Sequence, residues 1–317
     1  MLHALRYLSS AGPLASVARP SAVRTYHELS ADVVVVGPAR AEPAAYVVDP
    51  AGGDVVLGVY PDRTLGVLRA GRMVSLRFQR LVLETGTYER LPPIPGNDLP
   101  GVVGLEATEI YGRAGALRRG LRIALWGPPD QQARGRALAT RHGLEVVWSG
   151  DAAPRRIVGR SKVRAIELER GRVACDLFVV GVRQPAIDLA LQAGATAILT
   201  TGELPILAID STPEWLEIRG TAALRSSGVP DVRPAPETIA CACEDVRVKD
   251  LQACVAQGLD QPELVKRRTG AMTGPCQGKL CAATVLATLR DCGADPAPTR
   301  SRPLARPVTL GELAADA

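Results

Sequence analysis

The chain has 317 residues, of which 46% are hydrophobic and 22% charged, with a formal net charge of +5. This length is enough for two domains with sizeable cores. The interspersed basic and acidic residues, with only 3% aromatics, are a poor basis for nucleic-acid binding, and no apolar run reaches the roughly 18 residues of a membrane-spanning helix. The sequence therefore predicts a globular protein with neither a nucleic-acid partner nor a membrane span.

The N-terminal stretch 1–27 contains Arg, Ser and Ala but no acidic residue before Glu28. Organellar transit peptides have a similar composition. The alternative is a poorly ordered extension, which is common at the ends of chains. We expect an N-terminal extension over residues 1–30 and favour the second interpretation.

The next part of the chain alternates short apolar runs with Gly and Pro turns. Residues 31–37 (ADVVVVG) and 81–86 (LVLETG) predict buried strands that each end at a glycine, and such continuous apolar runs suit a parallel sheet covered on both faces. Residues 45–70 predict further short strands. Residues 92–101 (PPIPGNDLPG) predict a rigid loop, because Pro and Gly recur too densely for a helix or a strand.

A helix is predicted over 105–113, followed by a strand–turn–helix–strand unit that begins with the strand 122–126 and ends with LEVVWSG. Beyond this unit, polar turns separate further strands up to a buried one over 177–181. Strands that alternate with helices indicate an α/β domain. We place this domain at residues 31–229.

The C-terminal quarter has a different composition. Residues 230–238 are rich in proline and predict a linker. Residues 239–293 predict a small all-α domain that carries most of the cysteines. Residues 294–317 are rich in Pro, Arg and Ala and predict a flexible tail.

Four of the seven cysteines form two tight pairs: Cys241 and Cys243 in a C-x-C motif, and Cys276 and Cys281 in a C-x₄-C motif. Zinc sites more often show C-x₂-C or C-x₄-C pairs. A [2Fe–2S] centre needs two thiolates on each iron, which two close pairs can supply. We therefore favour an iron–sulfur cluster over zinc, and either metal over an unliganded set of thiols.

The residues around these pairs suit a negatively charged cluster. Basic side chains that flank them would offset its charge, and nearby glycines would let backbone N–H groups approach its sulfurs. The basic residues are Lys266, Arg267, Arg268 and Lys279, and the glycines are Gly270, Gly274 and Gly278.

The other titratable residues do not predict a second site. Cys175, Cys254 and Cys292 are isolated in apolar surroundings and predict buried free thiols, so we expect a reducing compartment, the cytoplasm. The three histidines do not cluster, and His142 stands at a predicted helix end. Asp176 precedes a buried strand, where a structural role in a turn is the ordinary one.

The segment C-x-C-E-D-V, followed by V-K-R-x-T-G-A-M-x-G-P-C-Q-G-x-x-C, resembles the bacterioferritin-associated-ferredoxin-like [2Fe–2S] domain over residues 239–293. It is most similar to the version fused to α subunits of bacterial flavoprotein amine dehydrogenases and oxidases. These include sarcosine oxidase, hydrogen cyanide synthase, opine oxidase and the dye-linked proline dehydrogenases. The resemblance implies that Cys241, Cys243, Cys276 and Cys281 are the cluster ligands.

The resemblance extends upstream to LVLETGTYERLPPIPGNDLPGV (81–102) and to CDLFVVGVRQP with LALQAGA (175–195). In such proteins two Rossmann-like halves, one for FAD and one for NAD(P), are interleaved. The resemblance therefore implies an α/β fold with degenerate FAD/NAD(P)-binding Rossmann-like halves and a small all-α [2Fe–2S]-binding domain.

Both nucleotide-binding turns depart from the G-x-G-x-x-G pattern, whose glycines let a diphosphate approach a helix N-terminus. The first turn, which begins at Gly37, keeps one glycine, and the second is Gly-Pro-Pro-Asp at 127–130. A Gly–Asp pair of the relatives is replaced by Gly220-Thr221. FAD in a remodelled pocket would contact Gly37, Arg40, Thr85, Gly86, Gly220 and Thr221, with Arg40 on the phosphate. Alternatively, the halves are scaffolds that have lost their nucleotides; we expect FAD binding to be weakened or lost, and NAD(P) binding to be lost.

The resemblance implies an oxidoreductase subunit that passes electrons through a [2Fe–2S] cluster in a heteromeric flavin-dependent amine or imino-acid dehydrogenase or oxidase. Its expected partners are a flavoprotein β subunit of the D-amino-acid-oxidase type and an electron acceptor. This chain shows no catalytic base, so substrate oxidation is expected in the partner. The alternatives are a structural or regulatory subunit with a structural metal site, and an atypical flavoprotein.

Overall fold

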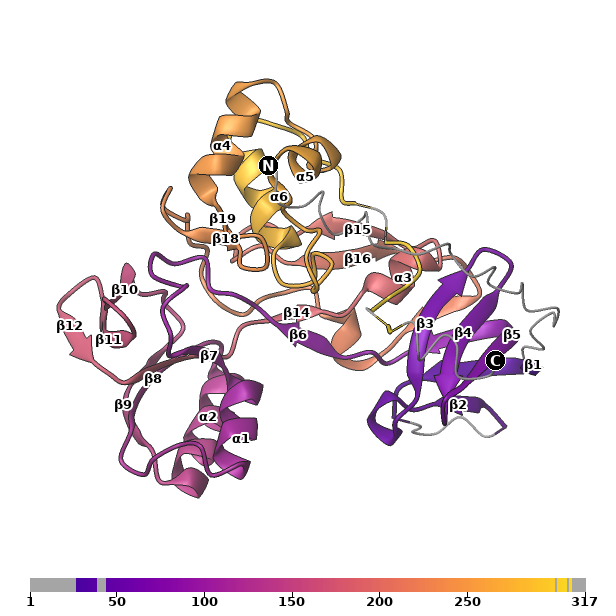
Figure 1. Cartoon of the computed structure of the whole chain (residues 1–317), viewed down its shortest axis with the longest axis horizontal. Coiled ribbons are helices and arrows are strands. Elements are labelled where there is room, and N and C mark those ends of the chain that lie inside the picture. Colours follow the sequence, from indigo (N-terminus) through magenta and orange to yellow (C-terminus); the bar gives the residue numbers. More distant parts are fainter. Residues whose placement is uncertain (1–26, 39–43, 300, 307, 310–317) are drawn as a thin grey trace, which may run out of the picture.

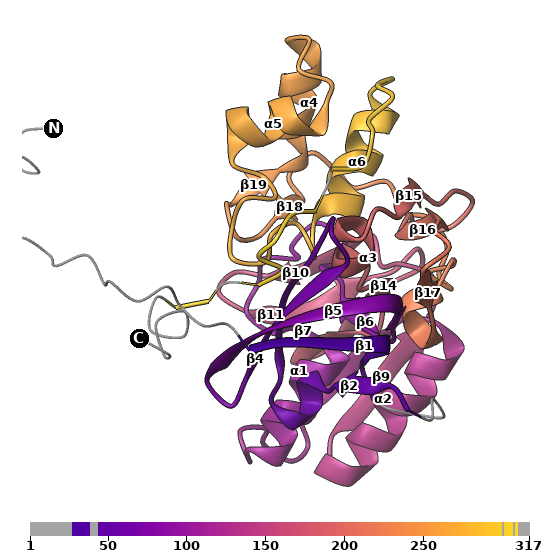
Figure 2. The same cartoon turned by 90° about the vertical axis from the view of Figure 1, so that its right-hand side faces the viewer.

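A computed structural model describes residues 27–38, 44–299, 301–306 and 308–309. Two sheets lie at opposite ends of the long axis, and a narrow two-stranded ribbon joins them (Figure 1). The helices of the cysteine segment lie above this ribbon, on the same side of both sheets in the two views (Figures 1 and 2). Among the described residues, every helix is too short or too polar to span a bilayer.

The first sheet has six strands in the order β2–β1–β5–β4–β3, with β17 paired to the end of β5. β1, β2, β5 and β17 are mutually parallel neighbours, and β3–β4–β5 is an antiparallel meander. The predicted strands at 31–37 and 81–86 thus lie side by side. The bounds are β1 (His27–Val36), β2 (Tyr46–Val48), β3 (Val55–Tyr60), β4 (Thr64–Arg69), β5 (Arg72–Leu83) and β17 (Leu216–Ile218), with a 3₁₀ turn η1 (Pro50–Gly52) between β2 and β3.

The second sheet has the order β7–β13–β8–β9 and is parallel throughout. Two helices pack against it, and α2 is the crossover between β8 and β9, as the strand–turn–helix–strand pattern predicts. Trp126 stacks on Phe178 inside this half. The bounds are β7 (Val102–Gly104), α1 (Leu105–Arg113), β8 (Arg122–Trp126), α2 (Pro129–His142), β9 (Glu145–Gly150) and β13 (Leu177–Val180), with a small antiparallel sheet of β10 (Arg156–Gly159), β11 (Val163–Glu167) and β12 (Arg172–Ala174).

The ribbon between the two halves consists of β6 (Thr87–Glu89) and β14 (Arg183–Pro185), which pair antiparallel. The chain therefore crosses between the halves twice, as interleaved halves require. After the second crossing it forms α3 (Asp188–Gln192), the hairpin β15 (Thr196–Leu199) and β16 (Leu207–Ser211), then β17 and a 3₁₀ turn η2 (Gly220–Ala223).

The cysteine segment is not all-α, so this part of the predicted fold class is wrong. β18 (Ile239–Cys241) and β19 (Val246–Arg247) form an antiparallel ladder ahead of the helices α4 (Val248–Ala256), α5 (Pro262–Thr269) and α6 (Ala282–Asp291). Strands of three and two residues are too short to show a two-residue hydrophobic period. The apolar core of this segment also includes Ile187, Leu199 and Leu207, so it is continuous with the ribbon and the β15–β16 hairpin.

The expected flexible tail contains an ordered stretch at Ser301–Ala305. Ala305 donates its N–H to Leu57 O (2.7 Å) and is 8% exposed. Gln192 on α3 donates to Arg302 O at 2.9 Å. The stretch therefore packs against the first sheet and α3.

Candidate metal centre

The four paired cysteines come from three local structures. Cys241 ends β18, Cys243 lies in the turn that leads to β19, Cys276 lies in the loop after α5, and Cys281 is the N-cap residue of α6. The side chain of Cys281 shifts the pKa of both Cys241 and Cys276, and the side chains of Cys276 and Cys243 shift each other's pKa. The fold thus brings all four predicted ligands into one continuous group of sulfur atoms.

The surroundings of these thiols favour negative charge on two of them. Hydrogen bonds from the Cys281 thiol, and then from backbone N–H groups, lower the pKa of Cys241 to about 6 and that of Cys276 to about 5. The same contacts raise the pKa of Cys281, which acts as their donor. For Cys243, a backbone hydrogen bond at Cys276 lowers the pKa, but burial and the Cys276 side chain raise it by more. Two sulfurs are therefore predisposed to act as thiolate ligands.

The backbone is tightly fitted around the sulfurs, as the nearby glycines predict. A Cβ on Gly274 would lie 2.3 Å from the Cβ of Cys243 and 3.3 Å from its Sγ, so only glycine fits there. Three non-glycine residues of the cysteine segment have a positive φ: Asp245 (50°), Met272 (67°) and Gln277 (53°). Such conformations cost energy and gather at functional sites, so their presence supports a functional role for these turns.

An all-sulfur donor set suits iron or zinc and excludes hard cations such as Mg²⁺. Within the described residues, no group of three or more His, Cys, Asp or Glu is arranged so that it could hold a metal ion. The four cysteines are linked in the order Cys243–Cys276–Cys281–Cys241 by the effects of their side chains on one another's pKa. A di-iron core needs two thiolates at each iron, a number that these four cysteines supply.

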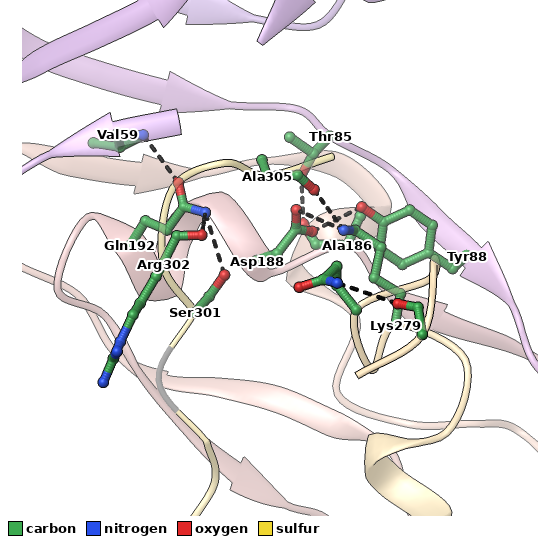
Figure 3. A network of polar contacts seen from close by, with 12 residues as sticks. Val59, Thr85, Tyr88, Ala186, Asp188, Gln192, Lys279, Ser301, Arg302 and Ala305 are labelled. Atoms are coloured by element: carbon green, nitrogen blue, oxygen red, sulfur yellow. Dashed lines mark hydrogen bonds and ion pairs between the residues drawn. The ribbon is translucent and has the colours of Figure 1, made fainter. Parts of the chain in front are cut away.

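Lys279 makes contacts that the sequence does not predict. It lies in the loop between Cys276 and Cys281, but its ammonium group donates to Ala305 O (2.6 Å) and lies 3.7 Å from Asp188 Oδ2. Asp188 also accepts from the Tyr88 hydroxyl at 2.7 Å (Figure 3). Lys279 therefore fastens the cysteine loop to the ribbon, to α3 and to the C-terminal stretch.

A cavity of about 270 Å³ lies beside this network. One wall is the cysteine loop itself, through Gln277 and Gly278, and the opposite wall comes from β14 and α3, through Gln184 and Leu191. The cavity lies where the cysteine segment, the ribbon and the stretch Ser301–Ala305 meet.

The residues predicted to contact FAD gather at the carboxyl ends of the parallel strands of the first sheet. A Cβ on Gly37 would lie 2.7 Å from Glu84 O, and one on Gly86 would lie 3.9 Å from Thr221 Oγ1. Thr85 Oγ1 donates to Ala186 O at 2.7 Å. Gly37, Thr85, Gly86, Gly220 and Thr221 thus share one edge, where doubly wound folds bind their ligands. Arg40 lies outside the described residues.

Among the described residues, no helix follows β1 at this edge, where one normally receives the diphosphate. Residues 37–45 are all that joins β1 to its parallel neighbour β2, whereas a crossover that contains a helix takes a dozen or more residues. Gly37 fits against Glu84 backbone rather than against open space. The contact residues are therefore together, but this connection is shorter than the helical crossover of a classical site.

The second turn offers few backbone N–H groups for a phosphate. α2 begins at Pro129 with Pro128 as N-cap, so two of the amides that could bind phosphate are missing, and Asp130 stands in the first turn. A Cβ on Gly228 would lie 2.8 Å from the Cβ of Pro128. The chain at Gly228 thus packs against Pro128 beside this helix end, while Pro129 and Asp130 remain exposed.

The remaining residues that the sequence analysis considered lie outside the cysteine group and the edge described above. Cys175 and Cys254 are buried as expected, whereas Cys292 is exposed, because it follows the last turn of α6 at the surface. His142 is in the last turn of α2, with Glu109 at 3.6 Å. Asp176 accepts from the Arg122 backbone N–H at 3.0 Å and pairs with its guanidinium.

The structure defines a mixed α/β protein with an attached four-cysteine segment. Over 91% of its length it has the fold of the L-proline dehydrogenase from P. horikoshii (TM-score 0.68, 14% identity, 80% of that chain covered). Residues 237–317 match the model of the sarcosine oxidase A3 domain.

Two opine oxidase subunits are similar to about a quarter of the chain. The subunit from Agrobacterium tumefaciens (strain Ach5) is 40% identical over 85 residues, which is 25% of this chain and 17% of that protein. The subunit from Rhizobium meliloti is 36% identical over 83 residues, 25% of this chain and 16% of that protein. The matches thus span less than a fifth of these relatives. Together with the fold, they support an α-type subunit of the sarcosine oxidase and opine oxidase kind and confirm the resemblance seen in the sequence.

Proposed function

We propose that this chain is an electron-transfer subunit of a heteromeric flavin-dependent enzyme that oxidises C–N bonds of amines or imino acids. The observation that carries the proposal is the group of four sulfurs from Cys241, Cys243, Cys276 and Cys281. These residues would hold a [2Fe–2S] cluster, which accepts and releases one electron at a time.

The chain's own residues hold the sulfurs in place. The side chain of Cys281 acts on those of both Cys241 and Cys276, and the close approach of Gly274 fixes the position of Cys243. Cys243 is exposed and Cys276 is half-buried, so one side of the group faces the surface. Exposure on one side suits exchange of electrons with another protein.

We place substrate oxidation in a partner protein of the same complex. Because an iron–sulfur cluster cannot take a hydride, a flavin has to divide the electron pair of a C–N bond into single electrons. The remodelled edge of the first sheet supports weak or absent FAD binding by this chain, and the prolines and Asp130 at the start of α2 support loss of NAD(P) binding. The matching relatives are named as opine oxidase subunits, which is consistent with a flavoprotein β subunit of the D-amino-acid-oxidase type as that partner.

The alternative is a structural or regulatory subunit in which zinc holds the cysteine segment together. Structural zinc also takes four thiolates. Protein purified without oxygen separates the two functions. An electron carrier should be brown, with two iron atoms and two acid-labile sulfides per chain and an absorbance that dithionite bleaches. Colourless protein with one zinc ion and no sulfide would refute electron transfer.

A further inference from the structure

A buried arginine, Arg90, lies between the ribbon and the helix that follows Cys281. It comes directly after β6 and is 4% exposed. One terminal nitrogen donates to Pro205 O, the other donates to Thr284 Oγ1 at 3.0 Å, and Nε is buried without a partner. Among the described residues, no Asp or Glu forms an ion pair with it, whereas most other buried charges in proteins are paired.

The nearby charged side chains do not neutralise this guanidinium. A small cavity of about 120 Å³ next to Arg90 is lined by Asp231, Glu203, Asp291 and Arg290. Asp231 is exposed and acts on Arg90 only through long-range attraction, while burial lowers the pKa of Arg90 to about 10. Arg90 is therefore a cation at neutral pH. Its burial costs desolvation energy, and no direct ion pair offsets this cost.

The side chain that holds Arg90 belongs to the metal centre's own helix. α6 begins at Ala282, Cys281 is its N-cap residue in a helical conformation, and Thr284 follows three residues later. Side chains three residues apart lie on one face of a helix, with Cβ atoms roughly 5–6 Å apart. The guanidinium is thus bound to a residue one helical turn after Cys281, in the first turn of α6.

We propose that Arg90, anchored by Thr284, is the buried counter-charge of the four-sulfur centre and raises its reduction potential. This inference rests on the proposed function. Two ferric ions, two sulfides and four thiolates form a dianion, and reduction by one electron brings one iron to the ferrous state and adds a negative charge with no proton required. A fixed buried cation stabilises the more negative state, because the field inside a protein is weakly screened.

Potentiometric titration of the full chain with Arg90→Gln tests this role. Loss of the charge should lower the midpoint potential of the cluster by about 59 mV, a roughly tenfold change in the reduction equilibrium of a one-electron couple. Arg90→Lys keeps the charge and should restore most of the shift. Arg290→Gln is the matched control: it removes an exposed cation from the same helix, so solvent screening should leave the potential nearly unchanged.

A second variant keeps the test decisive if Arg90→Gln does not load its cluster. Thr284→Val has nearly the shape of the native side chain but no hydroxyl to hold the guanidinium, and it should lower the potential by a smaller amount. Iron and acid-labile sulfide are measured first in each protein. If variants that contain the cluster keep the wild-type potential, the role of Arg90 is wrong and the proposed function still stands. Wild-type protein without sulfide would overturn this inference and the proposed function together.

Discussion

At the scale of single residues, the four cysteines can be predicted from the sequence, but much of what holds them cannot. Two tight pairs with flanking glycines stand out in the sequence, and the structure brings the four sulfurs together. Arg90 gives no such signal, because its burial and its bond to Thr284 depend on a contact between residues 194 positions apart. The sequence places Lys279 beside the cluster, yet Asp188 and Ala305 O determine where it points.

Gly274→Ala should abolish cluster loading while leaving most of the fold intact. The new Cβ would meet Cys243 Cβ at 2.3 Å, which forces the Cys243 turn away from Cys276. The measurement is iron and sulfide per chain, with circular dichroism as the check on folding. Gly258→Ala is the control: a Cβ there meets nothing within 4 Å, and its φ of +79° predicts only backbone strain of about 1 kcal/mol. Equal loading of the two variants would contradict the close approach.

The ion pair of Asp54 and Arg69 should make the first sheet sensitive to acid. Arg69 bonds both carboxylate oxygens and lowers the pKa of Asp54 from 3.8. Since the folded pKa lies below the unfolded one, the pair stabilises the protein above about pH 4 and this stability is lost as the pH falls through the folded pKa. Partial exposure limits the effect to about 1 kcal/mol. Asp54→Asn should therefore flatten the pH dependence of the stability measured by urea unfolding between about pH 6 and about pH 3.

The exposed pair Arg155–Glu169 is the matched comparison for that measurement, because its side chains are 62% and 78% exposed. Glu169→Gln should change stability by less than about 0.5 kcal/mol at any pH, since surface pairs are screened. A similar flattening in both variants would attribute the acid sensitivity to general charge rather than to Asp54.

At the scale of elements, sequence-based prediction is accurate where hydrophobic period and length are strong. The helix at 105–113 and the strand at 122–126 have the bounds that the sequence predicts. The ladder β18–β19 is too short to show a period, and its closing turn depends on Asp245 at φ 50°. The prolines of the loop 92–101 predict rigidity, but its main contact is made by Asn97, whose amide binds the strand that leads to Cys241.

Asn97 should be the strongest single link between the α/β body and the cysteine segment. Its Nδ2 donates to Pro92 O and Ile239 O at 2.8 Å, its Oδ1 accepts from the Ile239 N–H at 3.1 Å, and it is 3% exposed. Asn97→Ala leaves buried backbone groups unpaired, so we expect a loss of about 2–4 kcal/mol in urea unfolding and weaker cluster retention.

The adjacent Asp98 provides the control for Asn97. It lies 3.6 Å from Arg247 and its side chain is 48% exposed, so Asp98→Asn should cost less than about 1 kcal/mol. If both variants lose the same stability, the loop acts through its charge and not through the amide of Asn97.

At the scale of the whole molecule, the interleaving of the two halves follows from the resemblance, whereas the state of their nucleotide sites depends on contacts distant in sequence. The missing glycines indicate weakened sites. Only the structure shows that Gly228 packs against Pro128 at the start of α2 and that residues 37–45 alone join two parallel strands. These features favour a body that serves as a scaffold, with the redox function concentrated in residues 239–293.

Removal of the cluster should therefore separate the stabilities of the body and of the cysteine segment. The cores of the two sheets contain no described residue from 239–293, whereas the core of the segment includes Cys241 and Cys281 and depends on their position. Metal binding stabilises only the state that holds the ligands together. In differential scanning calorimetry, the loaded chain should melt in one transition, and chelator-treated chain under reducing conditions should show an earlier transition for the segment. Hydrogen exchange should then increase in α4–α6 and stay low in β1, β5, β8 and β13. Equal loss of protection in both regions would show that the cluster supports the whole fold rather than its C-terminal segment.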